Sequence, residues 1–296
     1  MVSSIVGNYL LENGLITYEQ LNDLMKEQRR TRVKLGLIAV AEGLLMPEEA
    51  ERINNLQSVM DMRFGDIAVE KGYLTEWEVE GLLAKQGNAY LVFAQALENQ
   101  QLMSIEQLEM YMMDFQREHQ LTIADIEDIK SDDVDRILPL YIPANSDSYL
   151  NVAGTALRTI MRCVDSDTYL DQAYRTKQYR ECHCALQYVE GEYSYTCGIA
   201  GEDEAILMVA SIFGKEEFQK VDRDALDAVG ELVNCINGLY TSSLSRGGVS
   251  SQLCPPELLV EEGDIASENM MIIPLHIKGH KVDLIIAMDD RIQARQ

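Results

Sequence analysis

The sequence predicts a multidomain protein, with an all-α helical-repeat domain followed by an α+β domain built on an antiparallel sheet. Residues in the first half recur with a step of 29, whereas the second half alternates helical periodicity with β-rich hairpin patterns. At 296 residues the chain has the length of about two domains. We therefore expect a helical-repeat domain of about four units at residues 1–118, a linker helix and extended segment at 119–144, and the α+β domain at 145–296.

The composition excludes several classes of protein. The proportions of 47% hydrophobic and 25% charged residues are those of a globular chain, and the net charge of −24 argues against a nucleic-acid polymer as partner. The longest apolar run, Ala205 to Ala210, is far shorter than the roughly 20 residues that cross a membrane. The N-terminus lacks a basic segment followed by a long apolar core, so the 6 cysteines are expected to be reduced. We expect a cytoplasmic protein with no membrane contact.

Three sets of residues in the first half share the step of 29: Gly7, Gly36 and Gly65; Gly14, Gly43 and Gly72; Gln28, Gln57 and Gln86. Each unit is typical of a short helix, a glycine stop and a longer helix. The second set of glycines suits the left-handed position that ends a helix. A capping box begins the next helix at Thr17–Gln20, Thr75–Glu78 and Ser104–Gln107, and Pro47 stands in the first turn of the corresponding helix of the second unit.

The third unit carries the pattern Arg63-Phe-Gly-x2-Ala-Val-x2-Gly72-Tyr-Leu-x4-Val79-x3-Leu83-x2-Gln86. This pattern resembles the MshEN motif in the N-terminal domains of type II secretion and pilus-assembly ATPases. A looser copy runs from Lys34-Leu-Gly to Gln57. Tandem motifs of that family bind cyclic di-GMP. The resemblance implies that six residues contact the nucleotide: Lys34, Gly36, Gln57, Arg63, Gly65 and Gln86.

The physical chemistry of such a site is reasonable, since an arginine stacks on a guanine base and backbone amides at a helix turn attract phosphate. A second interpretation of the same residues stays open. In it the glycines serve close helix packing, and the helical array is a docking module without a ligand.

The second half contains three predicted helices and two predicted hairpins. The helices are expected at residues 149–164, 204–213 and 222–243, and the hairpins at 181–199 and 270–288. Glu190-Gly191-Glu192 lies at the centre of the first hairpin and Lys278-Gly279-His280 at the turn of the second. Before this half, an acidic stretch that ends at Pro139 and Pro143 predicts a short linking helix and an extended segment. Helices that alternate with hairpins indicate an α+β fold.

The predicted helix at 222–243 has two different faces. Its core stripe consists of Leu226, Val229, Val233, Ile236 and Tyr240. Asp227, Glu231, Asn234 and Gly238 lie together on nearly the opposite side. A solvated face is one explanation for such a polar set. A glycine there would also let the backbone of another protein come close.

The longer spacing Asp227-x3-Glu231-x2-Asn234-x21-Pro256 resembles the signature of the CheC/CheX/FliY chemotaxis phosphatases. The resemblance covers residues 145–296 and implies a CheX-like phosphatase. Its substrate would be the aspartyl phosphate of a response-regulator receiver domain, which supplies its own Mg²⁺. Asn234 would hold the attacking water and Glu231 would pair with the lysine of the regulator. Asp227, Gly238 and Pro256 would have supporting roles.

The resemblance also leads to expectations about assembly and alternatives. The predicted helix at 149–164 has no Glu-x2-Asn, so one site per chain and a homodimer, as in the CheX branch, are expected. Cys182-His183-Cys184 has no second cysteine–histidine cluster, so we expect no metal site and no intrinsic cofactor. The rival to a phosphatase is a non-catalytic adaptor that binds a receiver domain, while its N-terminal array senses cyclic di-GMP or docks to a motility or secretion component.

Overall fold

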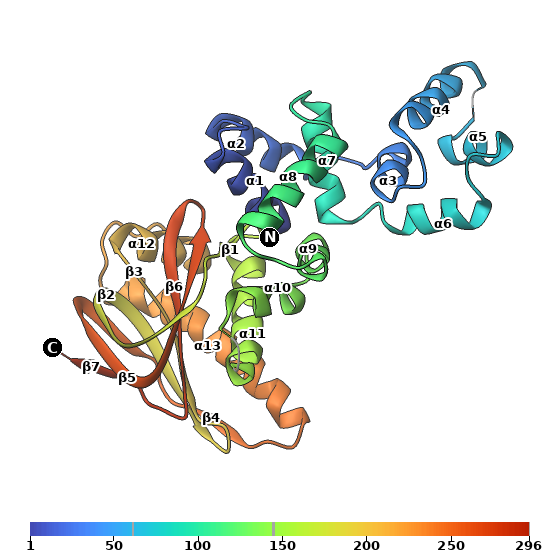
Figure 1. Ribbon diagram of the computed structural model, residues 1–296. Coiled ribbons are helices and arrows are strands. Elements are labelled where there is room, and N and C mark those ends of the chain that lie inside the picture. The colour runs from blue at the N-terminus through green and yellow to red at the C-terminus, as the bar shows by residue number, and fades with distance from the viewer. Residues whose placement is uncertain (61, 144–145, 296) are drawn as a thin grey trace. The chain divides into compact units, whose positions relative to one another are not determined.

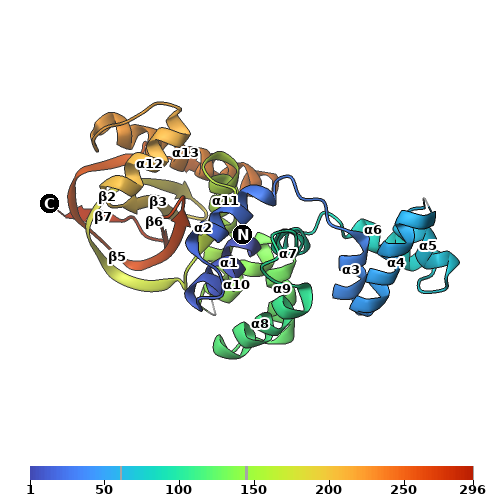
Figure 2. The ribbon, with the colours of Figure 1, turned by 90° about the horizontal axis from the view of Figure 1, so that it is seen from above.

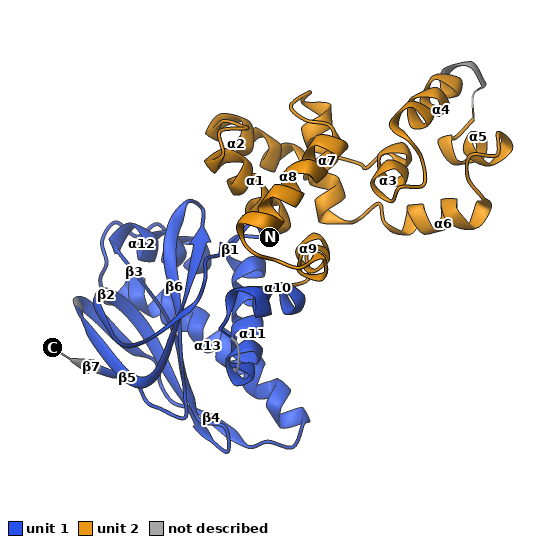
Figure 3. Ribbon diagram, in the orientation of Figure 1, with its two compact units in different colours: residues 1, 134–296 blue, residues 2–133 orange. Residues whose placement is uncertain are grey.

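A computed structural model describes residues 1–60, 62–143 and 146–295 of the chain (Figure 1). The chain forms two compact units, one of residues 2–133 and the other of residue 1 with residues 134–296 (Figure 3). The division falls inside the segment predicted as a linker. Residues 144 and 145, next to the boundary expected from the sequence, lie outside the described residues.

The first unit is helical throughout its described length. Its helices are α1 (Val2–Glu12), α2 (Tyr18–Glu27), α3 (Leu35–Ala41), α4 (Pro47–Met60), α5 (Phe64–Glu70), α6 (Glu76–Ala84), α7 (Ala89–Asn99), α8 (Ile105–Glu118) and α9 (Ile123–Lys130). A shorter helix precedes a longer one in the pairs α3–α4, α5–α6 and α7–α8, as the sequence predicts, whereas α1, with 11 residues, is slightly longer than α2, with 10. Over the described part of the whole chain, no helix combines the length and the apolar character needed to cross a membrane.

The predicted turns of this unit are confirmed in detail. Gly14, Gly43 and Gly72 have φ angles of 67°, 67° and 74°, the left-handed region in which glycine is favoured. The capping boxes form, with Thr17 accepting from the amide of Gln20 and Thr75 from that of Glu78. Ser104 begins α8 in the same way. Local chemistry therefore sets where α2, α6 and α8 begin and where α1, α3 and α5 end.

The other set of glycines lies where helices pack closely. A Cβ at Gly7 would meet Leu21 Cδ1 at 2.5 Å, and one at Gly65 would meet Val79 Cγ1 at 2.8 Å. At Gly36 the nearest atom would be Phe64 Cε2 at 3.0 Å. These distances are too short for an added carbon without movement of a neighbour. The three glycines thus have a packing role, as one of the two interpretations of the sequence proposes.

The segment expected as a short helix and an extended stretch forms two helices instead. α9 is followed by α10 (Val134–Tyr141), and Pro139 lies inside α10. The expectation of a single linking helix is therefore wrong, because residues 134–141 form a second one. Val134, Ile137 and Leu138 are buried on one face of α10, and this packing stabilises the helix in spite of the missing proline N–H.

The second unit contains helices and an antiparallel sheet. After α10 come α11 (Asp147–Cys163), β1 (Tyr169–Leu170), β2 (Tyr174–Gly191), β3 (Tyr195–Gly201), α12 (Asp203–Gly214), α13 (Arg223–Arg246), β4 (Ser251–Leu253), β5 (Glu257–Ile277), β6 (His280–Met288) and β7 (Gln293–Arg295). All three predicted helices and both hairpins of this half are present. β5 begins thirteen residues earlier than the predicted strand, because its first part pairs with β2 rather than with its hairpin partner.

The sheet closes on itself. Its strand order is β1-β5-β6-β3-β2-β4, β7 pairs with β5, and a further pairing joins β5 to β2. Seen from above, β2, β3, β5 and β6 curl round, with α12 and α13 along one side (Figure 2). The interior holds apolar side chains that include Cys184, Leu186, Ile272 and Ile285. Closure leaves the long strands without a free edge over much of their length.

Helix α13 covers the outer face of β2. Side chains of β2 alternate, so Cys184 and Leu186 enter the interior cluster while Ala185 and Gln187 lie on the other face. All five residues of the predicted core stripe of α13 are buried: Leu226, Val229, Val233, Ile236 and Tyr240. The prediction of this stripe is confirmed, and its burial determines which side of α13 remains open.

Two glycine substitutions should change stability in opposite directions. We expect Gly65→Ala to lower the free energy of unfolding by about 1–3 kcal/mol, because its Cβ would overlap Val79. Gly81→Ala should raise it by about 0.5–1 kcal/mol, because Gly81 lies inside α6 with nothing within 4 Å of an added Cβ. Urea unfolding followed by far-UV circular dichroism measures both effects. A stabilising Gly65→Ala would contradict the packing role.

Candidate functional site

The candidate site lies on α13, which begins at a strong cap. Asp222 accepts hydrogen bonds of 3.1 Å from the amides of Asp224 and Ala225. The hydrogen bond from Ala225 is the main reason that the pKa of Asp222 lies below its ordinary value. The cap and the buried stripe fix the start of the helix and its rotation about its axis. The polar residues of the opposite side are thereby held in a defined position.

The four residues predicted to share a face do so. Asp227 and Glu231 are exposed, and Asn234 and Gly238 are half-buried. A Cβ at Gly238 would meet nothing within 4 Å, so the space beside it is open. Cys235 is exposed next to Asn234, and the side chain of Leu239 is 42% exposed. The face thus offers two acids, a carboxamide and a small apolar area around an open glycine.

Pro256, far from this helix in the sequence, comes back to it. It precedes β5, and a Cβ at Gly230 would lie 3.5 Å from Pro256 Cβ and 3.2 Å from Leu258 Cδ2. Gly230 is the neighbour of Glu231 in the chain. Pro256 therefore packs against α13 at Gly230, where an added Cβ would crowd Leu258.

Asn234 has a buried partner that sequence reasoning missed. Gln187 Nε2 donates to Asn234 Oδ1 at 2.9 Å and to the main-chain oxygen of Cys254 at 2.8 Å. Gln187 is 1% exposed. The sequence predicts the strand that carries Gln187 but holds no signal for this contact, because the contact depends on how α13 is placed on β2.

Two histidines elsewhere in this unit have carboxylate partners. His183 Nε2 lies 2.8 Å from Asp203 Oδ1, and His276 Nε2 lies 2.8 Å from Asp171 Oδ2. The side chain of Cys182 lies outside what the structure describes. Among the described residues there is no group of three or more histidine, cysteine, aspartate or glutamate side chains that could hold a metal ion.

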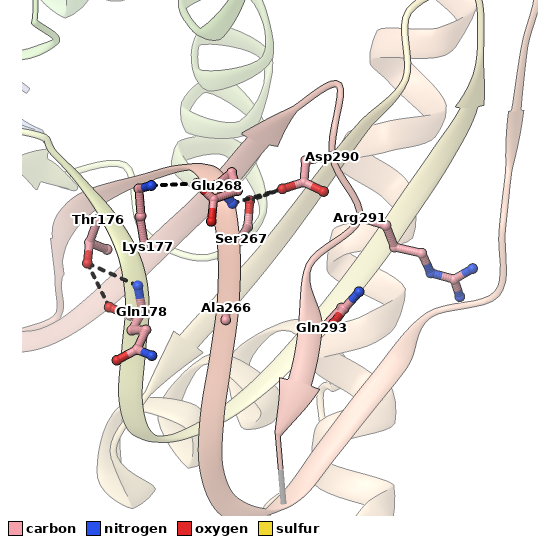
Figure 4. Close-up of a pocket in the computed structure, with 9 residues that line it drawn as sticks. All are labelled: Thr176, Lys177, Gln178, Ala266, Ser267, Glu268, Asp290, Arg291 and Gln293. Atoms are coloured by element: carbon pink, nitrogen blue, oxygen red, sulfur yellow. Dashed lines mark hydrogen bonds and ion pairs between the residues drawn. The ribbon is translucent and has the colours of Figure 1, made fainter.

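A polar cavity of about 580 Å³ lies away from the α13 face, between the start of β2, the middle of β5 and residues 290–293 at the start of β7 (Figure 4). Lys177 forms an ion pair with Glu268, and Ser267 Oγ donates to Asp290 Oδ2 at 2.7 Å. These pairs of the wall thus satisfy each other, whereas Arg291 of the wall pairs with Glu257 outside it. No residue predicted to belong to a site lines this cavity.

A second cavity of about 470 Å³ contains the buried carboxyl of Asp283. The hydroxyl of Tyr179 donates to Asp283 Oδ2. Burial raises the pKa of Asp283 above its ordinary value, although the hydrogen bond from Tyr179 opposes the shift. The carboxyl is therefore more easily protonated than an exposed aspartate.

The helical unit has a cavity of about 640 Å³ that collects five of the six residues predicted to contact a nucleotide: Lys34, Gln57, Arg63, Gly65 and Gln86. Gly36 does not line it and packs against Phe64 and Ala50 instead. The lining contains four pairs of residues separated by 29 positions: Lys34 and Arg63, Leu35 and Phe64, Asn54 and Leu83, Gln57 and Gln86. Equivalent positions of consecutive segments thus face a common space.

The two glutamines connect the two sides of this cavity. Gln57 Nε2 donates to the main-chain oxygen of Met62 at 3.4 Å, and Gln86 Nε2 donates to that of Val33 at 3.0 Å. Each acceptor residue directly precedes one of the basic residues, Arg63 and Lys34. Arg32 also lines the cavity, and Asp66 is the one acidic residue of the described lining. This balance of charge favours an anionic ligand.

Comparisons with known proteins bear on the second unit. Residues 183–276, in the C-terminal half, match the family model for the chemotaxis phosphatase CheX. This match contains Glu231, Asn234 and Pro256. No curated protein sequence matches the chain.

Solved structures with a similar fold include CheX from Desulfovibrio desulfuricans, with 16% identity and a TM-score of 0.41 over 47% of this chain and 97% of that one. A CheC-like superfamily protein from Shewanella sp. PV-4 has 19% identity and a TM-score of 0.43 over 49% of this chain and 99% of its own. The CheX–CheY–BeF3–Mg²⁺ complex from Borrelia burgdorferi has 16% identity and a TM-score of 0.40 over 47% of this chain and 96% of the other chain.

The exposed thiol on α13 should react before the buried ones. We expect N-ethylmaleimide to modify Cys235 in the native protein while Cys184 and Cys197 stay unmodified until urea is added. Burial raises the pKa of Cys197 to about 12, so its thiolate form is scarce at neutral pH. Mass spectrometry of proteolytic peptides gives the rate at each position. Equal rates at Cys235 and Cys197 without denaturant would contradict the geometry of the face.

Proposed function

We propose that the second unit hydrolyses the aspartyl phosphate of a response-regulator receiver domain. The observation that carries this proposal is a carboxamide and a carboxylate, Asn234 and Glu231, one turn apart on an exposed helix face within the region that matches CheX. Gly238 leaves space beside them for a partner's backbone. An exposed helix face, rather than a deep cleft, suits a substrate that is itself a folded domain.

The chemistry divides between the two proteins. The oxygen of a water molecule forms a bond to phosphorus as the bond from phosphorus to the aspartyl oxygen breaks, which releases the aspartate carboxylate and inorganic phosphate, with the water's protons passing to phosphate and solvent. Asn234 can both accept a hydrogen bond from this water and donate one, without placing a charge near the phosphoryl group. The receiver's own Mg²⁺ and lysine would neutralise the phosphoryl oxygens. This chain then needs no metal ligand of its own.

The acidic residues serve docking in this proposal. Glu231 is exposed and one turn before Asn234, so it can pair with a lysine of the receiver and bring the carboxamide to the phosphoryl group. Asp227 continues the acidic surface by one more turn. Pro256 packs next to Gly230 and supports the backbone that carries Glu231.

The alternative is an adaptor that binds a receiver without hydrolysis. Binding alone would need the acids and the open glycine but not a carboxamide. The half-exposed amide of Asn234 beside Glu231 therefore favours the enzyme. We also propose, from the family resemblance, a homodimer in solution, which light scattering after gel filtration tests.

For the first unit we propose an anionic nucleotide ligand, cyclic di-GMP, in the cavity between Lys34 and Arg63. Its volume of about 640 Å³ lies in the range of small-molecule sites. Pairs of equivalent residues line it, and such an arrangement suits a ligand whose two halves are alike. In this proposal the helical repeat is a sensory or docking module that regulates where or when the phosphatase acts.

Removal of the carboxamide should separate catalysis from binding. We expect Asn234→Ala to lower kcat for a phosphorylated receiver about a hundredfold, because the water loses its positioning group. Affinity for the receiver with beryllofluoride bound should stay nearly unchanged, because Glu231 and the open glycine remain. Release of inorganic phosphate and titration calorimetry measure the two quantities. Cys235→Ser, on the same face, is the control and should keep both.

If the wild-type chain binds phosphorylated receivers without hydrolysing them, the adaptor hypothesis would replace the phosphatase hypothesis. A wild-type chain that neither binds nor dephosphorylates any receiver of a two-component panel would contradict both.

Cyclic di-GMP should bind the helical unit with one arginine as a main contact. We expect saturable binding in calorimetry and its loss in Arg63→Ala, because alanine removes both a charge and a stacking surface from the cavity. Arg52→Ala is the matched control, since Arg52 is exposed on α4 and does not line the cavity. If cyclic di-GMP does not bind the wild-type chain, or if both variants lose binding equally, the proposed nucleotide site would be wrong. The helical unit would then be interpreted as a docking module without this ligand.

A further inference from the structure

A buried chain of three carboxamides ends at Asn234. Gln187, on β2, has both hydrogen-bonding ends in use: Nε2 donates to Asn234 Oδ1 and to the Cys254 carbonyl, and Oε1 accepts from Asn237 Nδ2 at 2.9 Å. Gln187 is 1% exposed and Asn237 is fully buried. Gln187 therefore contacts α13 at two positions and cannot itself reach a protein that docks on the exposed face.

One main-chain oxygen determines the orientation of all three side chains. The two ends of a carboxamide have nearly the same size, so contacts among amides alone leave it free to turn over. The Cys254 carbonyl can only accept, so the Gln187 atom 2.8 Å from it must be the NH2 group. The atom of Asn234 that faces this NH2 must then be Oδ1, and Asn237 must present its own NH2 to the oxygen of Gln187.

We infer that Gln187 is a positioning residue, which holds the carboxamide of Asn234 with Oδ1 toward the sheet and the NH2 group toward a docked receiver. The inference rests on the proposed phosphatase function. With one lone pair of Oδ1 engaged by Gln187, Asn234 keeps one acceptor direction and both N–H donors for the water and the phosphoryl oxygens. A turn of the amide would exchange donor and acceptor at the point where the water is held.

The position of Asn237 is explained by the same contact. Asn237 Oδ1 is buried and has no hydrogen-bond partner among the described residues, which costs stability. Its NH2 group holds the oxygen of Gln187 on the side away from Asn234. The Cys254 carbonyl and Asn237 of α13 thus hold the two ends of the Gln187 carboxamide in place. Gln187 in turn fixes the orientation of the Asn234 carboxamide.

The test compares Gln187→Met with Thr196→Val. Methionine has a volume close to that of glutamine but cannot donate to Asn234 or Cys254. We expect kcat for the phosphorylated receiver to fall about tenfold to a hundredfold in Gln187→Met, with KM and the affinity for the beryllofluoride-bound receiver unchanged. Thr196 is also buried, and its hydroxyl donates to the Asp290 carbonyl at 3.0 Å, away from Asn234. Thr196→Val should therefore keep the kcat of the wild type even if it lowers stability.

If Gln187→Met does not fold, Asn237→Ala tests the same constraint. This variant removes the donor to Gln187 Oε1, while Gln187 Nε2 can still donate to Asn234 Oδ1 and to the Cys254 carbonyl. Its kcat should fall by a smaller factor, again without a change in KM. An unchanged kcat in the folded variant, or an equal fall in Thr196→Val, would overturn the positioning role while the phosphatase function stands. A wild-type chain without phosphatase activity would overturn the proposed function first, and the inference with it.

Discussion

The packing of α13 on β2 is the interaction on which the second unit depends. The helix buries one stripe against the closed sheet, and Leu226, Val233 and Ile236 are completely buried there. Gly230 allows the segment of Pro256 and Leu258 to approach the same helix from the other edge. Because the stripe fixes the rotation of α13, it also decides that Asp227, Glu231 and Asn234 face outward. The core of the domain and the orientation of its candidate site are therefore set by the same contacts.

Features that depend on local sequence could be predicted, and features that depend on register could not. The left-handed glycines, the capping boxes and the two faces of α13 all follow from residues within one or two helical turns of each other. The early start of β5 and the closure of the sheet depend on pairing between β2 and β5, which are more than 60 residues apart in much of their contact. Gln187 was missed for the same reason. A buried glutamine in a strand becomes informative only when the helix above it is known.

The helical unit shows why glycine at a repeated position has two possible meanings. Gly14, Gly43 and Gly72 need their backbone angles, whereas Gly7, Gly36 and Gly65 need the absence of a side chain. Gly65 both packs against Val79 and lines the cavity between Lys34 and Arg63, whereas Gly36 packs against Phe64 and does not line that cavity. A sequence motif can therefore collect residues for binding and residues for packing under one pattern. The basic and amide side chains of the motif line the cavity and are the candidates for binding.

The choice of amides around Asn234 follows from charge. In the proposed function, a carboxylate at position 234 would add a negative charge next to the phosphoryl group of the substrate. A lysine at position 187 would have to be desolvated at a site that is almost completely buried. A glutamine avoids both costs and can still satisfy a main-chain carbonyl and a side-chain oxygen at once. Charge is kept instead on Asp227 and Glu231, which are exposed and can meet the charges of a partner. In the proposed phosphatase, the neutral carboxamide that would hold the water is thus itself held by neutral groups, and the charged residues would serve docking.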